Sequence, residues 1–448
     1  MRKDRLIRLV LFALAALALA VAASACGGSS NESEGGGSGG ASSTGGANEN
    51  VSGKVSVMGI WTADEQKSFQ AVIDGFEDKY PNVSVKYNPV GDNLPTVLST
   101  AVQGGNPPDI ADIAQPGLIQ GFVDKGAAKP IDFMKDTVAS NFGDSIVQVG
   151  TFNGKLYGLM FKAANKSTVW YNKAVYSDAG VEPTDDWDTF LKNADTIKAS
   201  GVPAYSIGGA DGWTLTDLFE NIYIRTAGAD LYDKLSKHEI KWTDQSVKEA
   251  LTEMAKVIGD SDNIAGGTEG ALQTDFPTSV SNVFAENPKA AMVLEGDFVP
   301  GVVETKLKAG TDYDVFDFPN INGSPKSVVG GGDIMTMFND TPATRAFMEY
   351  LATPEAAQIW AERGGFSSPN KQLDPSVYPD PILRKTASAI GEAEVFRFDM
   401  SDLQPSAFGA TVGQGEWKIF QDFLKNPQDI DGTASALESA AAKAFANQ

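Results

Sequence analysis

The alternation of hydrophobic and polar positions between residues 54 and 113 predicts strands and helices in turn. A strand is predicted from Val55 to Trp61, and the next segment places hydrophobic residues at 69, 72, 73 and 76, which is helical spacing. Alternation over 83–87 predicts a second strand, 94–102 a second helix and 110–113 a third strand. This order of elements is typical of a parallel sheet in an α/β protein.

The later part of the chain is predicted to be richer in helix. Helices are expected over 188–199, 216–226 and 246–258, and again from residue 415 onward. The segment 341–363 is also helical, with a break at Thr353-Pro354. Short hydrophobic runs over 290–294 and 313–318 predict two further strands.

The first 25 residues have the pattern of an export signal. Four basic residues precede a hydrophobic run from Leu9 to Ala23, and the small residues Ala23-Ser24-Ala25 lead to Cys26. This hydrophobic run is shorter than the roughly 20 residues that a membrane-spanning helix needs. Cys26 is the only cysteine, and its position resembles a bacterial lipobox, in which the cysteine carries a lipid. The alternative is an ordinary residue after a plain secretory cleavage site.

Residues 26–53 read as a flexible tether. Glycine and serine account for 17 of the 27 residues from Gly27 to Gly53, a composition that cannot build a hydrophobic core. The r.m.s. reach of such a segment is about 30 Å. We therefore expect an exported protein that is anchored to the outer face of the cell membrane through Cys26.

The charge of the chain excludes some partners. With 58 acidic and 36 basic residues the net charge is −22. Removal of the export signal, which carries +3, would bring it near −25. An acidic surface repels nucleic acid and anionic lipid headgroups, so neither is expected to bind. With a single cysteine no internal disulfide is expected, and the roughly 395 remaining residues are enough for two ordinary domains.

Several motifs together resemble the extracellular solute-binding proteins of ABC importers, in the sugar-binding branch. They are the Cys26 lipobox, residues 105–110 (GNPPDI), 154–159 (GKLYGL) with 170–173 (WYNK), 295–298 (EGDF), 330–333 (GGGD) and 350–356 (YLATPEA). The EGDF form resembles the α-glucoside-type subset. The resemblance covers residues 54–448. It implies a sugar as ligand, ABC permease subunits as partners, and a monomeric protein without cofactor.

The resemblance also implies an α/β fold of two lobes, each a mainly parallel sheet flanked by helices, with the ligand in the cleft between them. The first lobe is expected to comprise residues 54–161 and 327–365, and the second 162–326 and 366–448. Closure on the ligand would be a hinge motion. The hinge is expected near 162–165, 324–328 and 364–369, where the chain crosses between lobes.

Candidate ligand-binding residues follow the first and third strands. Sugars offer apolar faces to aromatic rings and hydroxyl groups to polar side chains. Ligands of open α/β sheets bind beyond the carboxyl ends of the strands, where Trp61, Asp64 and Gln115 stand. Trp61 could instead close the core, and Asp64 could serve the helix dipole. For Glu65 we favour a role in a capping box with Thr62 over a role in ligand binding.

Further candidates lie at the crossover and in the second half of the chain. Lys162 and Asn165 are at the expected hinge, where the alternative is a solvated segment. Asp211 and Trp213 precede a predicted helix, in a region where maltose-binding protein places an acid and an aromatic residue. Aromatic stacking on the sugar is expected from Trp213.

Three more candidates follow predicted buried segments. Asp297 and Phe298 come after the hydrophobic run at 290–294, and Asp333 follows three glycines that permit close backbone approach. Asp333 could also cap a turn. Phe366 and Phe408 are weaker aromatic candidates.

The residues give little support to an enzyme. His238 is the only histidine and stands in a polar stretch, so no zinc site or nucleophilic triad can be assembled. The acids at 260 and 262 fail the calcium-loop pattern because Ala271 stands where a glutamate is needed. We therefore expect a binding protein with no metal, no cofactor and no catalytic residue. The alternatives are a secreted carbohydrate-active hydrolase, which needs only two carboxylates, and an envelope solute sensor without a permease.

Overall fold

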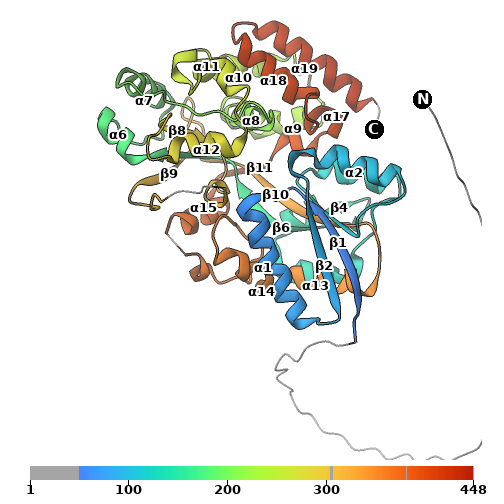
Figure 1. The fold of residues 1–448 in the computed structure, drawn as a ribbon. Coiled ribbons are helices and arrows are strands. Elements are labelled where there is room, and N and C mark those ends of the chain that lie inside the picture. Colours follow the sequence, from blue (N-terminus) through green and yellow to red (C-terminus); the bar gives the residue numbers. More distant parts are fainter. Residues whose placement is uncertain (1–49, 303–305, 380, 447–448) are drawn as a thin grey trace, which may run out of the picture. The chain divides into compact units, whose positions relative to one another are not determined.

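The computed structural model of the protein describes residues 50–302, 306–379 and 381–446 (Figure 1). The export signal, Cys26 and nearly all of the expected tether lie outside these residues. In the described part of the chain no helix is long and apolar enough to cross a membrane.

The larger of two main sheets has the strand order β11-β10-β3-β1-β2, with β6 also paired to β10. Strands β1, β2 and β3 run parallel, while β10 runs antiparallel to β3 and β6. The strands of this sheet are β1 (Gly53–Gly59), β2 (Val83–Pro89), β3 (Ile110–Ile113), β6 (Gly158–Asn165), β10 (Ser327–Met337) and β11 (Val395–Phe398).

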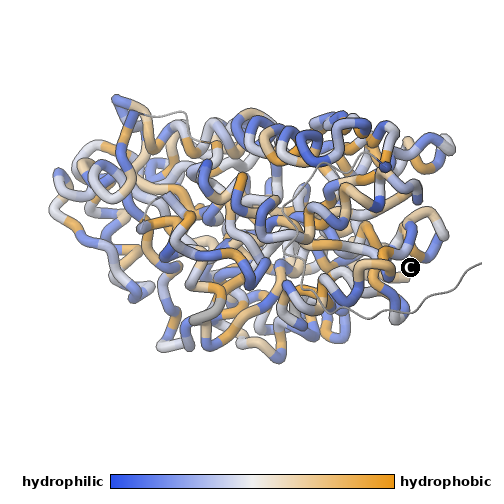
Figure 2. Tube along the Cα trace, turned by 90° about the horizontal axis from the view of Figure 1, so that it is seen from below, coloured by the Kyte–Doolittle hydropathy of each residue, from blue (hydrophilic) through white to orange (hydrophobic). Residues whose placement is uncertain are grey.

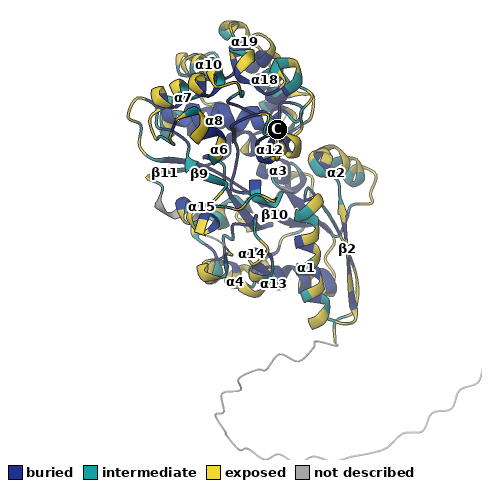
Figure 3. Ribbon diagram, turned by 60° about the vertical axis from the view of Figure 1, so that its left-hand side comes forward, coloured by how far each residue is buried: buried dark blue, intermediate teal, exposed yellow. Residues whose placement is uncertain are grey.

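Helices cover both faces of this sheet. On one face α1 (Ala63–Lys79), α13 (Pro342–Leu351) and α14 (Pro354–Ala361) contribute Phe69, Phe347 and Trp360 to a core with Val55 and Val57. On the other face α2 (Leu94–Gln103) and α3 (Pro116–Asp124) form a second core with the inner side of β3. The strands β3, β6 and β10 are buried along their whole length, and Figure 3 shows the outer faces of α1 and α13 as exposed.

The second main sheet has the order β8-β7-β9, built from β7 (Thr168–Asn172), β8 (Met292–Leu294) and β9 (Tyr313–Asp317). Two hydrophobic cores lie between this sheet and helices of the central part of the chain. These helices are α6 (Lys173–Ala179), α7 (Trp187–Ala199), α8 (Trp213–Ala227), α9 (Ala229–Ser236), α10 (Gln245–Ile258), α11 (Gly267–Ala271) and α12 (Phe276–Phe284). Figure 2 shows hydrophilic and hydrophobic positions alternating along the outer helices.

The remaining elements connect or cover these two sheets. A two-stranded hairpin consists of β4 (Thr151–Phe152) and β5 (Lys155–Leu156). The other helices are α4 (Lys135–Asn141), α5 (Asp144–Val149), α15 (Pro381–Glu392), α16 (Met400–Leu403), α17 (Ser406–Gly409), α18 (Gly415–Lys425) and α19 (Ile430–Phe445). Short 3₁₀ turns are η1 (Gly91–Asn93), η2 (Asp132–Met134), η3 (Ser261–Asn263), η4 (Val299–Gly301) and η5 (Pro375–Val377).

The structure has the predicted α/β class and differs from the prediction in two features. The second sheet is antiparallel, because β7 pairs with both β8 and β9 in that sense; isolated bridges such as those of Tyr205 with Ile264 and Met292 are parallel. In addition, β11 pairs with β10 in the first sheet, although residues 366–448 were assigned to the second lobe. Both features depend on contacts between distant segments, which local periodicity does not encode.

Candidate ligand-binding site

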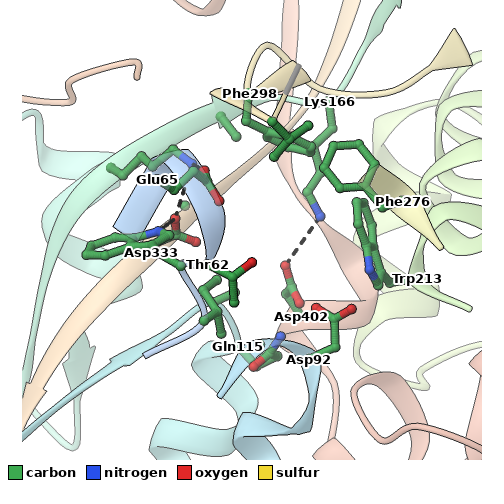
Figure 4. Close-up of a pocket in the computed structure, with 18 of the residues that line it drawn as sticks. Thr62, Glu65, Asp92, Gln115, Lys166, Trp213, Phe276, Phe298, Asp333 and Asp402 are labelled. Carbon is green, nitrogen blue, oxygen red and sulfur yellow. Dashed lines mark hydrogen bonds and ion pairs between the residues drawn. The ribbon is translucent and has the colours of Figure 1, made fainter. Parts of the chain in front are cut away.

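A cavity of about 200 Å³ opens where the loops that follow the parallel strands of the first sheet face the helices of the second half of the chain (Figure 4). The first sheet contributes its lining through the ends of β1 and β3, through η1 and through β6 and β10. The second half contributes α8, α12, α16, α18 and η4 with their flanks. The main side chains are Trp61, Thr62, Glu65, Asp92, Gln115, Lys162, Lys166, Trp213, Phe276, Phe298, Asp333, Asp402 and Trp417.

Lys162 is the centre of a charged group on one wall. Its ammonium lies 2.5 Å from Oε1 of Glu65 and 3.7 Å from Oδ2 of Asp333, and Asp333 also accepts a 2.7 Å hydrogen bond from Nε1 of Trp61. Burial lowers the pKa of Lys162, but the two carboxylates outweigh this effect and raise it above its usual value. Lys162 is therefore charged and holds two acceptors at the cavity edge.

The capping box predicted for α1 is wrong. Thr62 occupies the N-cap position, but its side chain makes no capping hydrogen bond. Glu65 instead accepts from Lys162, which is only 4% exposed. A buried ammonium needs a carboxylate more than an exposed helix end needs a cap, because the helix end can be hydrated.

Lys166 forms a second charged group on the opposite side of the cavity. Its ammonium lies 2.5 Å from Asp399, 3.2 Å from Asp217 and 3.6 Å from Asp402. Burial lowers the pKa of Lys166, and the three carboxylates together raise it well above its usual value. Burial and the charge of Asp399 raise the pKa of Asp402. Asp402 points into the cavity below the Lys166 ammonium in Figure 4.

Aromatic rings form the wall beside Lys166. Trp213, the first residue of α8, packs against Phe276 at 5.1 Å between ring centroids and Phe298 at 6.1 Å. The Lys166 ammonium lies 5.7 Å from the Trp213 ring centroid, within cation–π distance. Trp417 of α18 adds a further indole, and its Nε1 is buried without a hydrogen-bond partner. Such a wall offers flat apolar faces beside polar groups.

The structure brings six of the ten predicted ligand-binding residues to the cavity. They are Trp61, Gln115, Lys162, Trp213, Phe298 and Asp333. Trp61 lines the cavity and also packs in the aromatic core with Phe69 and Trp360, where it is 1% exposed. Close backbone approach is found at Gly332, where an added Cβ would stand 2.8 Å from the carbonyl oxygen of Lys162.

The other four predicted residues lie outside the cavity lining. Asp64 is half-buried and pairs with Lys67 at 2.5 Å. Asp211 accepts a 2.6 Å hydrogen bond from the backbone N–H of Phe276. Asp297 accepts from the N–H of Asn165 at 3.1 Å and from the hydroxyl of Ser367 at 2.6 Å, while Asn165 is itself fully buried.

Sequence reasoning did not select five residues that line the cavity. They are Asp92, Lys166, Phe276, Asp402 and Trp417. Lys166 stands one residue beyond the expected hinge, so its position beside the hinge could have identified it as a candidate. The others come from short helices or from helix ends whose place beside β1 and β3 follows only from the tertiary structure.

The described residues contain no cluster of three or more His, Cys, Asp or Glu side chains arranged to hold a metal ion. Glu65, Asp333 and Asp402 at the cavity each lie within ion-pair distance of Lys162 or Lys166. The site therefore offers hydrogen-bonding and stacking surfaces to an organic ligand.

Comparison with known proteins agrees with this architecture. The family model of bacterial extracellular solute-binding proteins matches residues 61–358. The alpha-glucosides-binding periplasmic protein AglE of Rhizobium meliloti is 32% identical over 86% of this chain and 86% of its own length. The osmoprotective compounds-binding protein GgtB of Synechocystis sp. is 30% identical over 85% of this chain and 90% of its own.

Solved structures show the same fold. The bacterial solute receptor AcbH superposes with a TM-score of 0.78 at 20% identity, covering 88% of this chain and 99% of its own. A chitin oligosaccharide binding protein gives a TM-score of 0.76 at 19% identity, covering 88% and 99%. The fold and site define a two-lobed solute receptor. This chain belongs to the bacterial extracellular solute-binding protein family, whose members are exported.

Proposed function

We propose that the protein is the substrate-binding component of an ABC importer, and that it captures a mono- or oligosaccharide, with α-glucosides among the candidate ligands. The observation that carries this proposal is the cavity itself, in which indole and phenyl rings stand beside lysine–carboxylate pairs. Rings of this kind stack on the apolar faces of a sugar, while the charged partners make strong hydrogen bonds to its hydroxyl groups. The relatives that bind alpha-glucosides and other solutes support the same class of ligand.

Closure of two lobes on the ligand would deliver it to the permease. We divide the lobes as 54–161 plus 327–365 and 162–326 plus 366–448, with β11 on the first sheet as the exception. Contacts among the expected crossover segments support this division. Asn165 pairs with Gly330, just after the segment 324–328, and Ala163 forms a bridge with Ser367 of the segment 364–369. A sugar that contacts both sides of the cavity binds the closed arrangement better and so shifts the population toward it.

The lipid anchor on Cys26 and the flexible tether belong to the same proposal. They would keep a monomeric receptor at the outer face of the membrane, within about 30 Å of its permease. Replacement Cys26→Ser should release the protein to the medium and leave ligand affinity unchanged. Retention of the variant at the membrane would contradict the lipid anchor alone.

The proposal is tested by a thermal-shift screen over mono-, di- and oligosaccharides, followed by calorimetry. A true ligand at 100 times its dissociation constant adds roughly 2.7 kcal/mol to the free energy of unfolding. Trp213→Ala should weaken binding strongly, whereas Val97→Ala, an exposed site outside the cavity, should not. Absence of any stabilising sugar would contradict the proposal, and release of a cleaved product would favour the hydrolase instead.

A further inference from the structure

Contacts between the two sides of the cavity surround its open volume. At the solvent-exposed edge, Asp92 of η1 meets Trp213 of α8. Gln115, which precedes α3, is hydrogen-bonded through its side-chain amide to Asp402 of α16. In both contacts a residue that follows the first sheet touches a residue from the second half of the chain. The two sides of the cavity therefore already meet at these points.

A further contact joins the two sides beside η4. A Cβ added at Gly365 would stand 2.5 Å from the Cα of Gly301, so the backbone of the first lobe touches that of η4 here. Phe298, just before η4, has its ring centroid 5.6 Å from the Lys162 ammonium. The structure thus has a closed arrangement of the two sides, and the cavity of about 200 Å³ is the space that remains for a ligand.

The aromatic wall is one continuous platform and not a row of separate rings. The ring centroids of Trp213, Phe276 and Phe298 lie 5.1, 5.4 and 6.1 Å from one another, which is the spacing of rings in direct contact (Figure 4). An oligosaccharide that stacks along its length needs aromatic rings spaced from one sugar unit to the next. This platform, made of the three rings, offers stacking to a single sugar ring.

Both charged groups of the cavity flank this same platform. The Lys166 ammonium lies 5.7 Å from the ring centroid of Trp213, and the Lys162 ammonium lies 5.6 Å from that of Phe298. Each lysine is accompanied by carboxylates that accept hydrogen bonds. One sugar ring on the platform is therefore within reach of polar partners on both sides, so the groups suited to sugar recognition converge on one position.

The volume of the cavity agrees with one ring. A cavity of about 150 Å³ accepts benzene, whereas sites for drug-sized ligands measure about 300–1,000 Å³. The volume of about 200 Å³ found in this protein lies between these values. It accommodates one six-membered ring with its hydroxyl groups, and a second ring of the same kind would need as much space again.

We propose that the cavity holds a single sugar ring and that Asp92 closes it against a second ring. The ligand class is a monosaccharide, or a glycoside whose other part is smaller than a sugar ring. This inference rests on the proposed sugar-binding function and specifies the size of the ligand in the same cavity. Asp92 sets the limit because it is the exposed member of the contact with Trp213.

The test is a chain-length series measured by calorimetry. Glucose is compared with maltose and maltotriose, galactose with melibiose, xylose with xylobiose, and N-acetylglucosamine with its β-1,4-linked disaccharide. Each monosaccharide that binds should do so about tenfold more tightly than its longer partners, the low end of what pocket shape achieves against a single extra methylene group. A di- or trisaccharide that binds more tightly than its monosaccharide would overturn the inference and leave the proposed function standing. If no sugar of any length binds, both are wrong.

Variants at Asp92 test the second half of the proposal. Asp92→Ala removes the side chain that closes the edge, so a second ring can extend into solvent and most of the preference for the monosaccharide should be lost. Asp92→Asn keeps the size of the side chain and should retain the preference, which separates size from charge. The matched control is Asp262→Ala, because Asp262 is also an exposed acid in a 3₁₀ turn, η3, but lies outside the cavity lining. A preference that survives Asp92→Ala, or that disappears equally in Asp262→Ala, would contradict the role of Asp92.

Discussion

The indole Nε1 of Trp61 donates a 2.7 Å hydrogen bond to the carboxylate of Asp333, across 272 residues of sequence. Trp61 is almost fully buried, so Trp61→Phe would keep most of the ring and remove the donor. A hydrogen bond to a charged group is worth about 1.5–3 kcal/mol. We expect the free energy of unfolding, measured by urea denaturation, to fall by that amount beyond the loss from the smaller ring.

Trp242→Phe is the matched control for this hydrogen bond. Trp242 is also fully buried, but its Nε1 has no hydrogen-bond partner, so the replacement changes ring size without breaking a bond. The excess loss in Trp61→Phe over Trp242→Phe isolates the contact with Asp333. Equal losses in the two variants would show that this contact contributes nothing to stability.

Replacement of Gly117 or Gly121 by alanine is expected to change stability in opposite directions, although both residues lie on one helix, α3. A Cβ added at Gly117 would stand 2.0 Å from the carbonyl oxygen of Gln404, whereas one added at Gly121 would meet nothing within 4 Å. Gly117→Ala should therefore destabilise the protein by about 1–3 kcal/mol, since backbone must move to accept the methyl group. Gly121→Ala should stabilise it by about 0.5–1 kcal/mol, because alanine favours the helix. Denaturation midpoints that shift in the same direction would contradict this account.

The sequence was sufficient to predict the fold where hydrophobic periodicity is local. The strands and helices from residue 53 to 113 lie close to their predicted positions, and the break between α13 and α14 falls at Thr353-Pro354. The strands β6 and β10 were not predicted, because they are buried along their whole length and show no alternation. The three glycines at 330–332 were predicted only to permit close backbone approach, and they belong to β10 and pair with β6.

Part of the candidate site was predictable from strand order. Trp61 and Gln115 come directly after parallel strands, so their place at one edge of the sheet could be inferred. The buried acid Asp297 has the same sequence signature, yet it accepts hydrogen bonds from Asn165 and Ser367. Whether an acid faces a ligand or the protein interior is set by partners 70 or more residues away in these cases.

Asp112 and Asp399 are two buried acids with opposite expected responses to amide replacement. Burial, followed by the charge of Asp333, raises the pKa of Asp112 well above its usual value and so favours its neutral form. Asp399 is also buried, but the Lys166 ammonium 2.5 Å away outweighs this effect and lowers its pKa. Because burial disfavours the charged form of Asp112, we expect Asp112→Asn to change the free energy of unfolding by less than about 1 kcal/mol.

Asp399→Asn removes a charge that Lys166 requires. Removing one partner of a buried ion pair lowers the free energy of unfolding by about 3–5 kcal/mol. Part of that loss could be offset by Asp217 and Asp402, which also contact Lys166, so the lower end of the range is expected. Urea denaturation of both variants at pH 7 measures the contrast. A larger loss in Asp112→Asn than in Asp399→Asn would mean that the ionisation states are reversed.

Asp211 gives the protein a stability that depends on pH. Burial, the largest influence, raises the pKa of Asp211 to about 7, although the hydrogen bond from the N–H of Phe276 acts in the opposite direction. In the unfolded chain the pKa of an aspartate is about 3.9. Between these values the folded state holds a proton that the unfolded state has released, so the contribution of Asp211 to stability decreases as pH rises from about 4 to about 7.

The difference in unfolding free energy between wild type and Asp211→Asn isolates this effect, because other buried acids with a raised pKa, such as Asp402, remain in both proteins. Measured by urea denaturation from pH 4.5 to 8, roughly the window set by the two pKa values, wild type minus variant should fall through that interval and level off above it. Carbon-13 NMR of the Asp211 carboxyl group should show a midpoint near 7. Parallel stability profiles, with a carboxyl titration near its ordinary value, would show that Asp211 is ionised in the folded protein throughout.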